Sequence, residues 1–411
     1  MKRISIFGYG VTTKPLVELL NSQGFGCDIF DDNCAAFVSE EKNRFYPSSE
    51  FDPQKSELEI TSPGIPPYHP LITQAQNLRS EYDFFDELMQ EKPLSIWVSG
   101  TNGKTTTTEM LEFLLKERGA KSGGNIGYPL TELYLKKPSI WVLETSSFML
   151  HYTKHAYPKL YLLLPIREDH IHWHGGFDGY VRDKLSPLER MGEDTIALIP
   201  RELEGHALCK GARARVVYYE GSGGLAEELG LDIGGSVFRE PFLLDSVLAL
   251  ASSKLLFDEA DSAGLNEFRI DSHRIEEVRD SKGRLWVDDS KGTNVAATLE
   301  AIKSYGEKKI FLILGGDDKG ANQEPIFELL SGLKVEVFLI GSNAERLESL
   351  ARQYGVAHHR CEVLERAVGE IKERLGLEEV ALLSPAAASL DQFRSYKERG
   401  ELFKKLALEA E

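Results

Sequence analysis

The sequence predicts an α/β protein in which mainly parallel sheets form three domains. Short apolar stretches of strand length alternate with helical periodicity along most of the chain, as is typical of strand–helix–strand units. The length of 411 residues also exceeds the usual size of one domain. We expect an N-terminal Rossmann-like domain over residues 1–92, a central P-loop-type parallel sheet over 93–267 and a C-terminal Rossmann-like domain over 268–411.

In the first block, a strand at Ile4–Phe7 precedes Gly8-Tyr9-Gly10, a helical pattern and a second strand at Cys27–Phe30. This order is half of a doubly wound nucleotide-binding domain. The third glycine of the dinucleotide fingerprint is missing, because Thr13 stands there. The fingerprint is therefore incomplete, which disfavours a dinucleotide-dependent oxidoreductase. A third strand, 57–61, leads into a proline-rich turn.

In the second block, apolar stretches predict strands at 95–98, 140–144, 160–164 and 195–199. Helices are predicted at 109–118 and 242–257, the second of them buried. The glycine-rich stretch 221–235 is predicted to be a surface loop, and 258–265 a turn. The third block carries predicted strands at 285–287, 310–314, 335–340 and 380–383, with helices at 296–305 and 362–375.

The composition excludes several classes of protein. A formal net charge of −17 argues against a nucleic-acid partner, because phosphate backbones attract basic proteins. No apolar run has the length of a membrane-spanning helix, and the N-terminus does not resemble a signal peptide. The four cysteines form no C-x-x-C pair, which fits a reduced, cytoplasmic setting. We also expect a monomer.

Gly100 to Thr106 lie between a predicted strand and a predicted helix, where backbone N–H groups and the helix N-terminus attract phosphate. Lys104 can reach the β- and γ-phosphates, and the Thr105 hydroxyl can bind Mg²⁺. Val98 replaces the first glycine of the full P-loop pattern, so the loop is a shortened variant.

Polar groups follow the next two strands. Glu144 ends one strand and is placed to hold Mg²⁺ directly or through water. After the other strand, Asp169 can orient His170. A zinc site shared by His170, His172 and His174, on one face of an extended segment, is an alternative, but no thiolate lies nearby. Lys184 follows in a helical stretch. From this local pattern alone, its side chain is expected to be solvated.

These motifs together resemble the Mur ligases. The similar segments are Gly100–Thr106, Gly124–Gly127, Leu143–Phe148, Glu168–His170, Ser272–Arg274, Asp288–Asn294, Gly315–Lys319 and Ser384–Phe393. The last three are most similar to the branch that adds D-glutamate. The resemblance implies an ATP-dependent amide-forming ligase of cell-wall synthesis with UDP-N-acetylmuramoyl-L-alanine and D-glutamate as substrates. It also implies that the first domain binds the UDP group, the second ATP and the third the amino acid.

The resemblance assigns roles to individual residues. Catalytic positions are Lys104, His170, Lys184 and Arg274, and metal-binding positions for two Mg²⁺ are Thr105, Glu144, His170 and Lys184, the last as a carbamate. ATP-binding positions are Gly100, Thr101, Asn102, Gly103, Lys104, Thr105, Thr106, Arg274, Asp289 and Asp317. Substrate-binding positions are Val11, Thr12, Asp31, Asp32, Gly64, Asn125, His170, Lys291, Thr293, Lys319, Ser389, Leu390 and Tyr396.

The chain departs from the family pattern in two places. The adenine-side motif with two asparagines is replaced around Phe242 and Asp245, and the central domain is shorter around 199–235. A ligase for another amino acid or for folate extension is the nearest alternative. A nucleotide-binding switch without catalysis is a second, although the group Asp169, His170, Lys184, Asp289 and Lys291 favours an enzyme. For Ser389, capping of a helix over 390–393 is an alternative to substrate binding.

Overall fold

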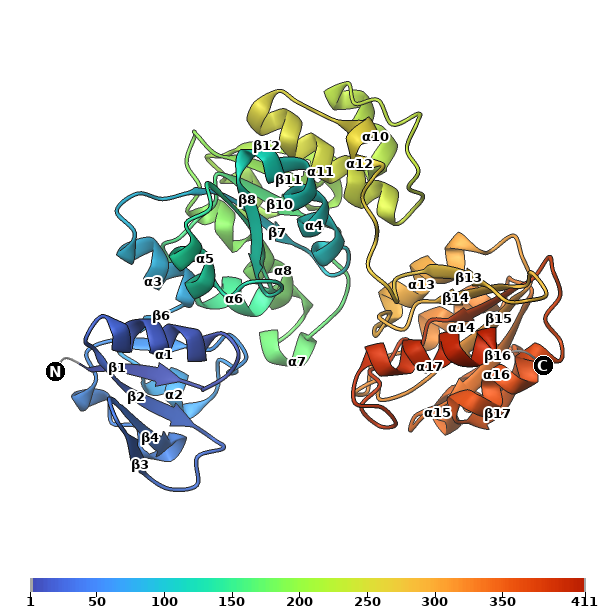
Figure 1. The fold of residues 1–411 in the computed structure, drawn as a ribbon, viewed down its shortest axis with the longest axis horizontal. Helices are drawn as coiled ribbons and strands as arrows, with labels where there is room; N and C mark the ends of the chain where they lie inside the picture. The colour runs from blue at the N-terminus through green and yellow to red at the C-terminus, as the bar shows by residue number, and fades with distance from the viewer. Residues whose placement is uncertain (1–2, 410–411) are drawn as a thin grey trace. The chain divides into compact units, whose positions relative to one another are not determined.

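The computed structural model describes residues 3–409 and contains three six-stranded sheets that follow one another along the chain (Figure 1). Parallel strands dominate all three sheets and helices connect them, so the predicted α/β class is confirmed. The chain divides into two compact units, residues 1–268 and 269–411, and the first two sheets belong to the first unit. The three domain ranges given above stay predictions.

The N-terminal sheet is parallel except for its edge strand β3, which pairs antiparallel with β4. In spatial order it contains β3 (Val38–Glu40), β4 (Asn43–Pro47), β2 (Gly26–Asp31), β1 (Arg3–Phe7), β5 (Glu59–Thr61) and β6 (Leu78–Arg79). Its helices are α1 (Thr13–Ser22), α2 (Pro70–Gln74) and α3 (Glu81–Leu88). Thr13 is buried where the dinucleotide fingerprint has glycine. Its hydroxyl accepts from Gly10 N at 3.0 Å and donates to Gly8 O at 2.8 Å, which holds the turn closed.

The central sheet is parallel throughout. In spatial order it contains β12 (Arg215–Tyr219), β11 (Ile196–Pro200), β10 (Leu160–Leu163), β7 (Leu94–Ser99), β9 (Ile140–Glu144) and β8 (Ala120–Gly124). Its helices are α4 (Lys104–Leu115), α5 (Leu130–Lys136), α6 (Ser147–Tyr152), α7 (Ile171–His174), α8 (Phe177–Leu185), α9 (Ala207–Lys210), α10 (Gly221–Leu229), α11 (Phe242–Phe257) and α12 (Ser262–Leu265).

Helix α11 confirms the buried helix predicted at 242–257. The loop predicted at 221–235 is wrong over its first part, because Gly221–Leu229 forms helix α10. Glycine disfavours helices, but Leu225 and Ala226 are buried where α10 packs against α11. Tertiary packing therefore outweighs the local preference. The turn predicted at 258–265 likewise ends in the short helix α12.

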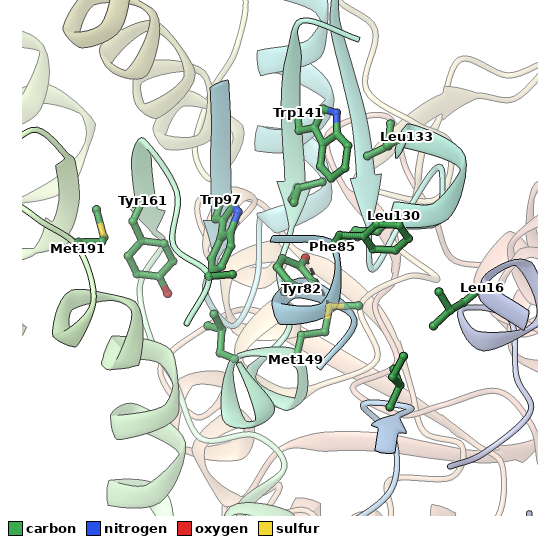
Figure 2. Packing of buried hydrophobic residues seen from close by; sticks show 14 of the residues in the cluster. Leu16, Tyr82, Phe85, Trp97, Leu130, Leu133, Trp141, Met149, Tyr161 and Met191 are labelled. Carbon is green, nitrogen blue, oxygen red and sulfur yellow. Dashed lines mark hydrogen bonds between the residues drawn. The ribbon is translucent and has the colours of Figure 1, made fainter. Parts of the chain in front are cut away.

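One continuous apolar core joins helix α3 to the central sheet and reaches Leu16 of α1. Figure 2 shows Tyr82 and Phe85 of α3 beside the aromatic side chains of Trp97 and Trp141, which come from β7 and β9. The Tyr82 and Trp97 rings meet edge to face, with centroids 4.8 Å apart. This shared core explains why the first two sheets form one compact unit.

The C-terminal sheet is parallel except for β13, which pairs antiparallel with β14. In spatial order it contains β13 (Glu276–Arg279), β14 (Leu285–Asp288), β18 (Val380–Leu383), β15 (Ile310–Leu314), β16 (Val335–Ile340) and β17 (Ala357–Glu362). Its helices are α13 (Val295–Ser304), α14 (Glu324–Leu330), α15 (Ala344–Gln353), α16 (Leu364–Lys372) and α17 (Tyr396–Leu408). Separate apolar clusters cover its two faces, so the inner strands β14, β18 and β15 are buried throughout.

Within residues 3–409, no helix combines the length and hydrophobicity that crossing a bilayer requires. All four cysteines are free thiols.

Asp83 of α3 provides a test of how the first unit is held together. Its carboxylate is fully buried and accepts three backbone N–H groups, from Lys154 at 2.7 Å and from His155 and Ala156 at 2.8 Å each. Asp83→Ala leaves these donors without their acceptor, and we expect it to lower the free energy of unfolding by about 3 kcal/mol. Thermal unfolding measures the change. Asp86→Ala, which removes only an ion pair to Lys92, should change it by less than about 1 kcal/mol. Equal midpoints for the two variants would contradict this role.

Candidate active site

The phosphate loop predicted at 100–106 connects β7 to α4 in the middle of the central sheet. Two of its glycines adopt backbone angles that other residues rarely reach, with φ of +140° at Gly100 and +82° at Gly103. A Cβ on Gly103 would lie 2.4 Å from Asp245 Oδ1. The Lys104 ammonium folds back over the loop and donates to Gly100 O at 3.0 Å and Thr101 O at 2.8 Å. The lysine thus lies over the turn that its motif predicts to hold phosphate.

The side chains of Thr105, Asn125 and Glu144 meet beside this loop, because they follow or end the neighbouring strands β7, β8 and β9. Glu144 ends β9, which lies between β7 and β8. The Thr105 hydroxyl donates to Glu144 Oε2 at 2.7 Å, and Asn125 Nδ2 donates to Oε1 at 2.6 Å. Glu144 is only 2% exposed. The hydroxyl and the carboxylate are hard oxygen donors of the kind that Mg²⁺ prefers, so this pair fits a magnesium ion.

Lys184 is buried, and the expectation of a solvated lysine is wrong. Its ammonium nitrogen donates to Gly100 O at 2.7 Å and lies 4.8 Å from the centre of the Tyr180 ring. Burial, and then the nearby charge of Lys104, hold the pKa of Lys184 well below its usual value. Helical periodicity could not reveal this, because it does not identify which face of α8 packs against the phosphate loop.

His170 lies at the start of α7 in the left-handed conformation, with φ of +53°. Asp169 accepts from its backbone N at 3.0 Å, and Asp169 Oδ2 lies 3.5 Å from His170 Nε2. The imidazole packs on the Phe148 ring, with centroids 4.7 Å apart. Burial lowers the pKa of His170 despite the nearby Asp169. The expected pairing of Asp169 with His170 is therefore present.

The other two histidines of this run behave differently from each other. His172 is exposed, while the His174 side chain is fully buried and contacts Asp183 and Ser147. Residues 171–174 form the helix α7, so the extended segment expected for the zinc alternative is wrong. Among the described residues, the three histidines do not converge as metal ligands, so a zinc site shared by them is not supported. Ser147, His151 and Asp183 were not predicted as site residues, because their importance depends on contacts between helices.

The predicted uridine-side residues gather at one edge of the N-terminal sheet, after three neighbouring strands. Val11 and Thr12 follow β1. Asp31 ends β2 and Asp32 follows it, and Gly64 follows β5. Asp31 Oδ2 accepts from Tyr9 N at 2.7 Å, and Val11 is 82% exposed. The edge thus presents an exposed glycine turn next to carboxylates, as ribose and diphosphate binding requires.

In the second unit, Asp289 follows β14 and is buried. Burial raises its pKa to about 7, although the Ser384 hydroxyl donates to Oδ2 at 2.6 Å. Arg274 has two buried nitrogens, Nε and Nη2, that find no hydrogen-bond partner within residues 3–409. Unsatisfied buried donors are costly, so this guanidinium fits an anion such as a phosphate group.

The residues expected to bind the amino acid lie on several loops of this unit and at the start of α17. Lys319 is exposed, and its backbone N donates to Asp317 Oδ1 at 3.1 Å. Lys291 Nζ lies 5.6 Å from the centre of the Tyr396 ring. Thr293 is exposed, as is Leu390, whereas Ser389 is buried.

The alternative in which Ser389 caps a helix is wrong. The next helix, α17, begins at Tyr396, and Ser395 is its cap, with its side chain accepting from Glu398 N.

Known proteins resemble the chain along nearly its whole length. The Mur ligase middle domain family matches residues 98–230, and the Mur ligase glutamate ligase domain family matches residues 273–387. A UDP-N-acetylmuramoylalanine–D-glutamate ligase of Campylobacter jejuni is 46% identical over 408 residues, 98% of each chain. The enzyme of that name from Helicobacter pylori strain J99 is 46% identical over 419 residues, 99% of each chain. The chain belongs to the UDP-N-acetylmuramoylalanine–D-glutamate ligase family, a branch of the Mur ligases.

Solved Mur ligases share the fold of this family member at low sequence identity. The MurF ligase of Thermotoga maritima, solved with ADP, has a TM-score of 0.59 at 17% identity and covers 93% of this chain and 94% of its own. The UDP-N-acetylmuramate–alanine ligase MurC of the same organism has a TM-score of 0.53 at 16% identity, with 98% and 99% covered. These structures support the three-sheet architecture.

Gly103 tests the phosphate loop. Gly103→Ala places a Cβ against Asp245 and Leu164 in a backbone conformation that costs an L-residue about 1–2 kcal/mol. We expect ATP affinity, measured by calorimetry, to fall by about tenfold or more. Gly119→Ala is the matched control, because Gly119 has a similar φ of +78° but lies beyond the far end of α4. It should lower stability and leave ATP affinity unchanged. Unchanged affinity in Gly103→Ala would refute this account of the loop.

Proposed function

We propose that this family member is an ATP-dependent amide-forming ligase that joins D-glutamate to UDP-N-acetylmuramoyl-L-alanine in peptidoglycan synthesis. One observation carries the proposal. A full-length relationship at 46% identity coincides with a phosphate loop, the oxygen pair of Thr105 and Glu144, and a buried lysine in one place. These are the groups that phosphoryl transfer from ATP requires.

In the proposed reaction, the carboxylate of the UDP substrate attacks the γ-phosphorus of ATP and releases ADP. The amine of D-glutamate then attacks the acyl phosphate, and phosphate leaves from the tetrahedral intermediate. Lys104 and the N-terminus of α4 stabilise the negative charge on the triphosphate. His170 and Arg274 position the substrate and the transferred phosphoryl group, and Asn125 acts on the substrate side.

Thr105 and Glu144 are proposed to hold one Mg²⁺, because their oxygens already meet at 2.7 Å. His170 and a carbamylated Lys184 are proposed to hold a second. An ammonium group cannot bind a cation, whereas a carbamate offers oxygen ligands. The lowered pKa of Lys184 favours the neutral amine, which is the form that reacts with CO₂. Bound magnesium would neutralise charge on the phosphates.

The remaining predicted residues have roles in the other two sheets. The N-terminal edge defined above by Val11, Thr12, Asp31, Asp32 and Gly64 is proposed to bind the uridine diphosphate. Arg274, Asp289 and Asp317 are proposed to bind the nucleotide from the second unit. The D-glutamate carboxylates would meet Lys291, Thr293, Lys319, Ser389, Leu390 and Tyr396, a set in which basic and hydroxyl groups suit a dianion. A monomeric state and a cytoplasmic location stay predictions.

Phosphate release with a panel of amino acids tests the function. With ATP, magnesium and UDP-N-acetylmuramoyl-L-alanine, we expect release with D-glutamate and little with L-glutamate, L-alanine or L-lysine. Lys104→Ala is expected to fold normally and to lose this activity, because the triphosphate loses its cation. Preference for another amino acid would identify a different ligase, and release that needs no amine would exclude ligation.

Lys184→Ala tests the carbamate separately. The substitution leaves a cavity beside Gly100 O, the acceptor of the lysine, and should abolish phosphate release. Short carboxylic acids such as acetate should restore part of the activity by placing an oxygen ligand in the cavity. Lys184→Arg keeps the positive charge and fills the space, so the same acids should not rescue it. Absence of rescue in Lys184→Ala would contradict the carbamate while leaving the ligase reaction in place.

A further inference from the structure

We propose that Ser147, His151, His174 and Asp183 form a hydrogen-bond network that positions the metal-binding segments of the central domain. We refer to these four residues as the Asp183 network. The inference rests on the proposed function, because it concerns the same metal ligands, and it assigns positioning roles that neither the sequence motifs nor the family resemblance gave to these four residues.

The Asp183 network joins three helices in pairs. His174 of α7 bonds through Nε2 to the hydroxyl of Ser147 on α6, at 2.9 Å. Through Nδ1 the same ring bonds to Asp183 Oδ2 on α8, at 2.7 Å. His151, at the other end of α6, bonds through Nδ1 to the same oxygen at 2.9 Å. Each pair of helices is therefore connected by one side-chain hydrogen bond.

An expected metal ligand lies within, or just before, each connected helix and close to its network residue. Glu144 precedes Ser147 by three positions, His170 precedes His174 by four, and Lys184 directly follows Asp183. These spacings are short enough that a shift of a network residue moves the neighbouring ligand. The Phe148 ring strengthens the connection, because it contacts His170 and also stacks on His174, with centroids 5.5 Å apart.

The hydrogen-bond roles in the Asp183 network are consistent with one another. A carboxylate accepts only, so both imidazoles donate their Nδ1–H to Asp183. The other ring nitrogen of His174, Nε2, meets the Ser147 hydroxyl, which can either donate or accept. The His174 side chain has no solvent exposure, and Ser147 is only 3% exposed. His151 and Asp183 are half-buried. A polar chain that is buried at Ser147 and His174, and in which every member has a partner, is rigid and sensitive to the loss of one member.

A metal ion bound by these same residues is a poorer explanation. The ligand atoms of His151, His174 and Asp183 lie within 4.8 Å of one another. However, each Nδ1 is 2.7–2.9 Å from the carboxylate oxygen. Ligands around a tetrahedral zinc are separated by roughly 3.3 Å, since zinc–ligand bonds are about 2.0 Å long. Direct hydrogen bonds fit the observed spacing better.

The test compares Asp183→Ala with Asp183→Asn in the full-length chain. Mn²⁺ with the ATP analogue AMP-PCP serves as the probe, and the electron paramagnetic resonance signal reports its binding without turnover. Asp183→Ala breaks two of the three connections, and we expect it to weaken binding by about 10–100-fold, the usual effect of losing a group that orients metal ligands. Asp183→Asn should retain most of the affinity, because its amide oxygen can accept the same two bonds.

His174 supplies a second, independent pair. His174→Asn keeps a nitrogen near the Nδ1 position and so keeps the bond to Asp183, whereas His174→Leu loses both of its bonds. The leucine variant should bind Mn²⁺ more weakly than the asparagine variant. Tyr219→Phe is the control for general destabilisation, because it removes a buried hydrogen bond to Leu163 O in the same domain. It should leave Mn²⁺ binding unchanged.

The outcomes separate this inference from the proposed function. If the unmodified chain binds no Mn²⁺ with AMP-PCP, the proposed function itself fails. If it binds and Asp183→Ala binds equally well, only the positioning role fails. Equal weakening in Asp183→Ala and Asp183→Asn would show that the charge matters and not the hydrogen bonds, which would also overturn the inference.

Discussion

The hydrogen bonds that Glu144 accepts from Thr105 and Asn125 join the strands on which the whole central site is built. A nearly buried carboxylate is unfavourable without partners, and here each oxygen has a donor within 2.7 Å. The donors reach it only because β8, β9 and β7 are adjacent and parallel. Their carboxyl ends therefore meet at one edge of the sheet, which is where ligands bind in open α/β sheets. Strand order thus determines which residues form the site.

The same topological rule organises the other two sheets. In the N-terminal sheet, the expected uridine-side residues follow β1, β2 and β5, which are neighbours. In the C-terminal sheet, Asp289 follows β14, Asp317 follows β15 and Ser389 follows β18, again at carboxyl ends of adjacent strands. A chain with three sheets of this kind has three edges of the type at which open α/β sheets bind ligands, which matches the three substrates of the proposed reaction.

The sequence was sufficient for features that depend on local pattern. It predicted the phosphate loop, the central buried strands and α11, because apolar runs and glycine spacing leave few alternatives there. Short polar strands such as β3 and β17 have no such signal and were missed. Burial of Lys184, and the position of His174 between two helices, depend on packing between segments far apart in the chain. In helix α10 the local pattern is misleading. Its glycines predict a loop, but its contacts with α11 stabilise a helix.

Arg274 shows how a fold can store affinity for an anion. Two of its nitrogens are removed from water and have no acceptor among the described residues. A buried guanidinium without acceptors gains more binding free energy from a phosphate oxygen than an exposed guanidinium does. The cost of removing the buried group from water is already included in folding. In the role proposed for Arg274, a bound phosphate group would supply the missing acceptor and should stiffen the loop that carries this residue.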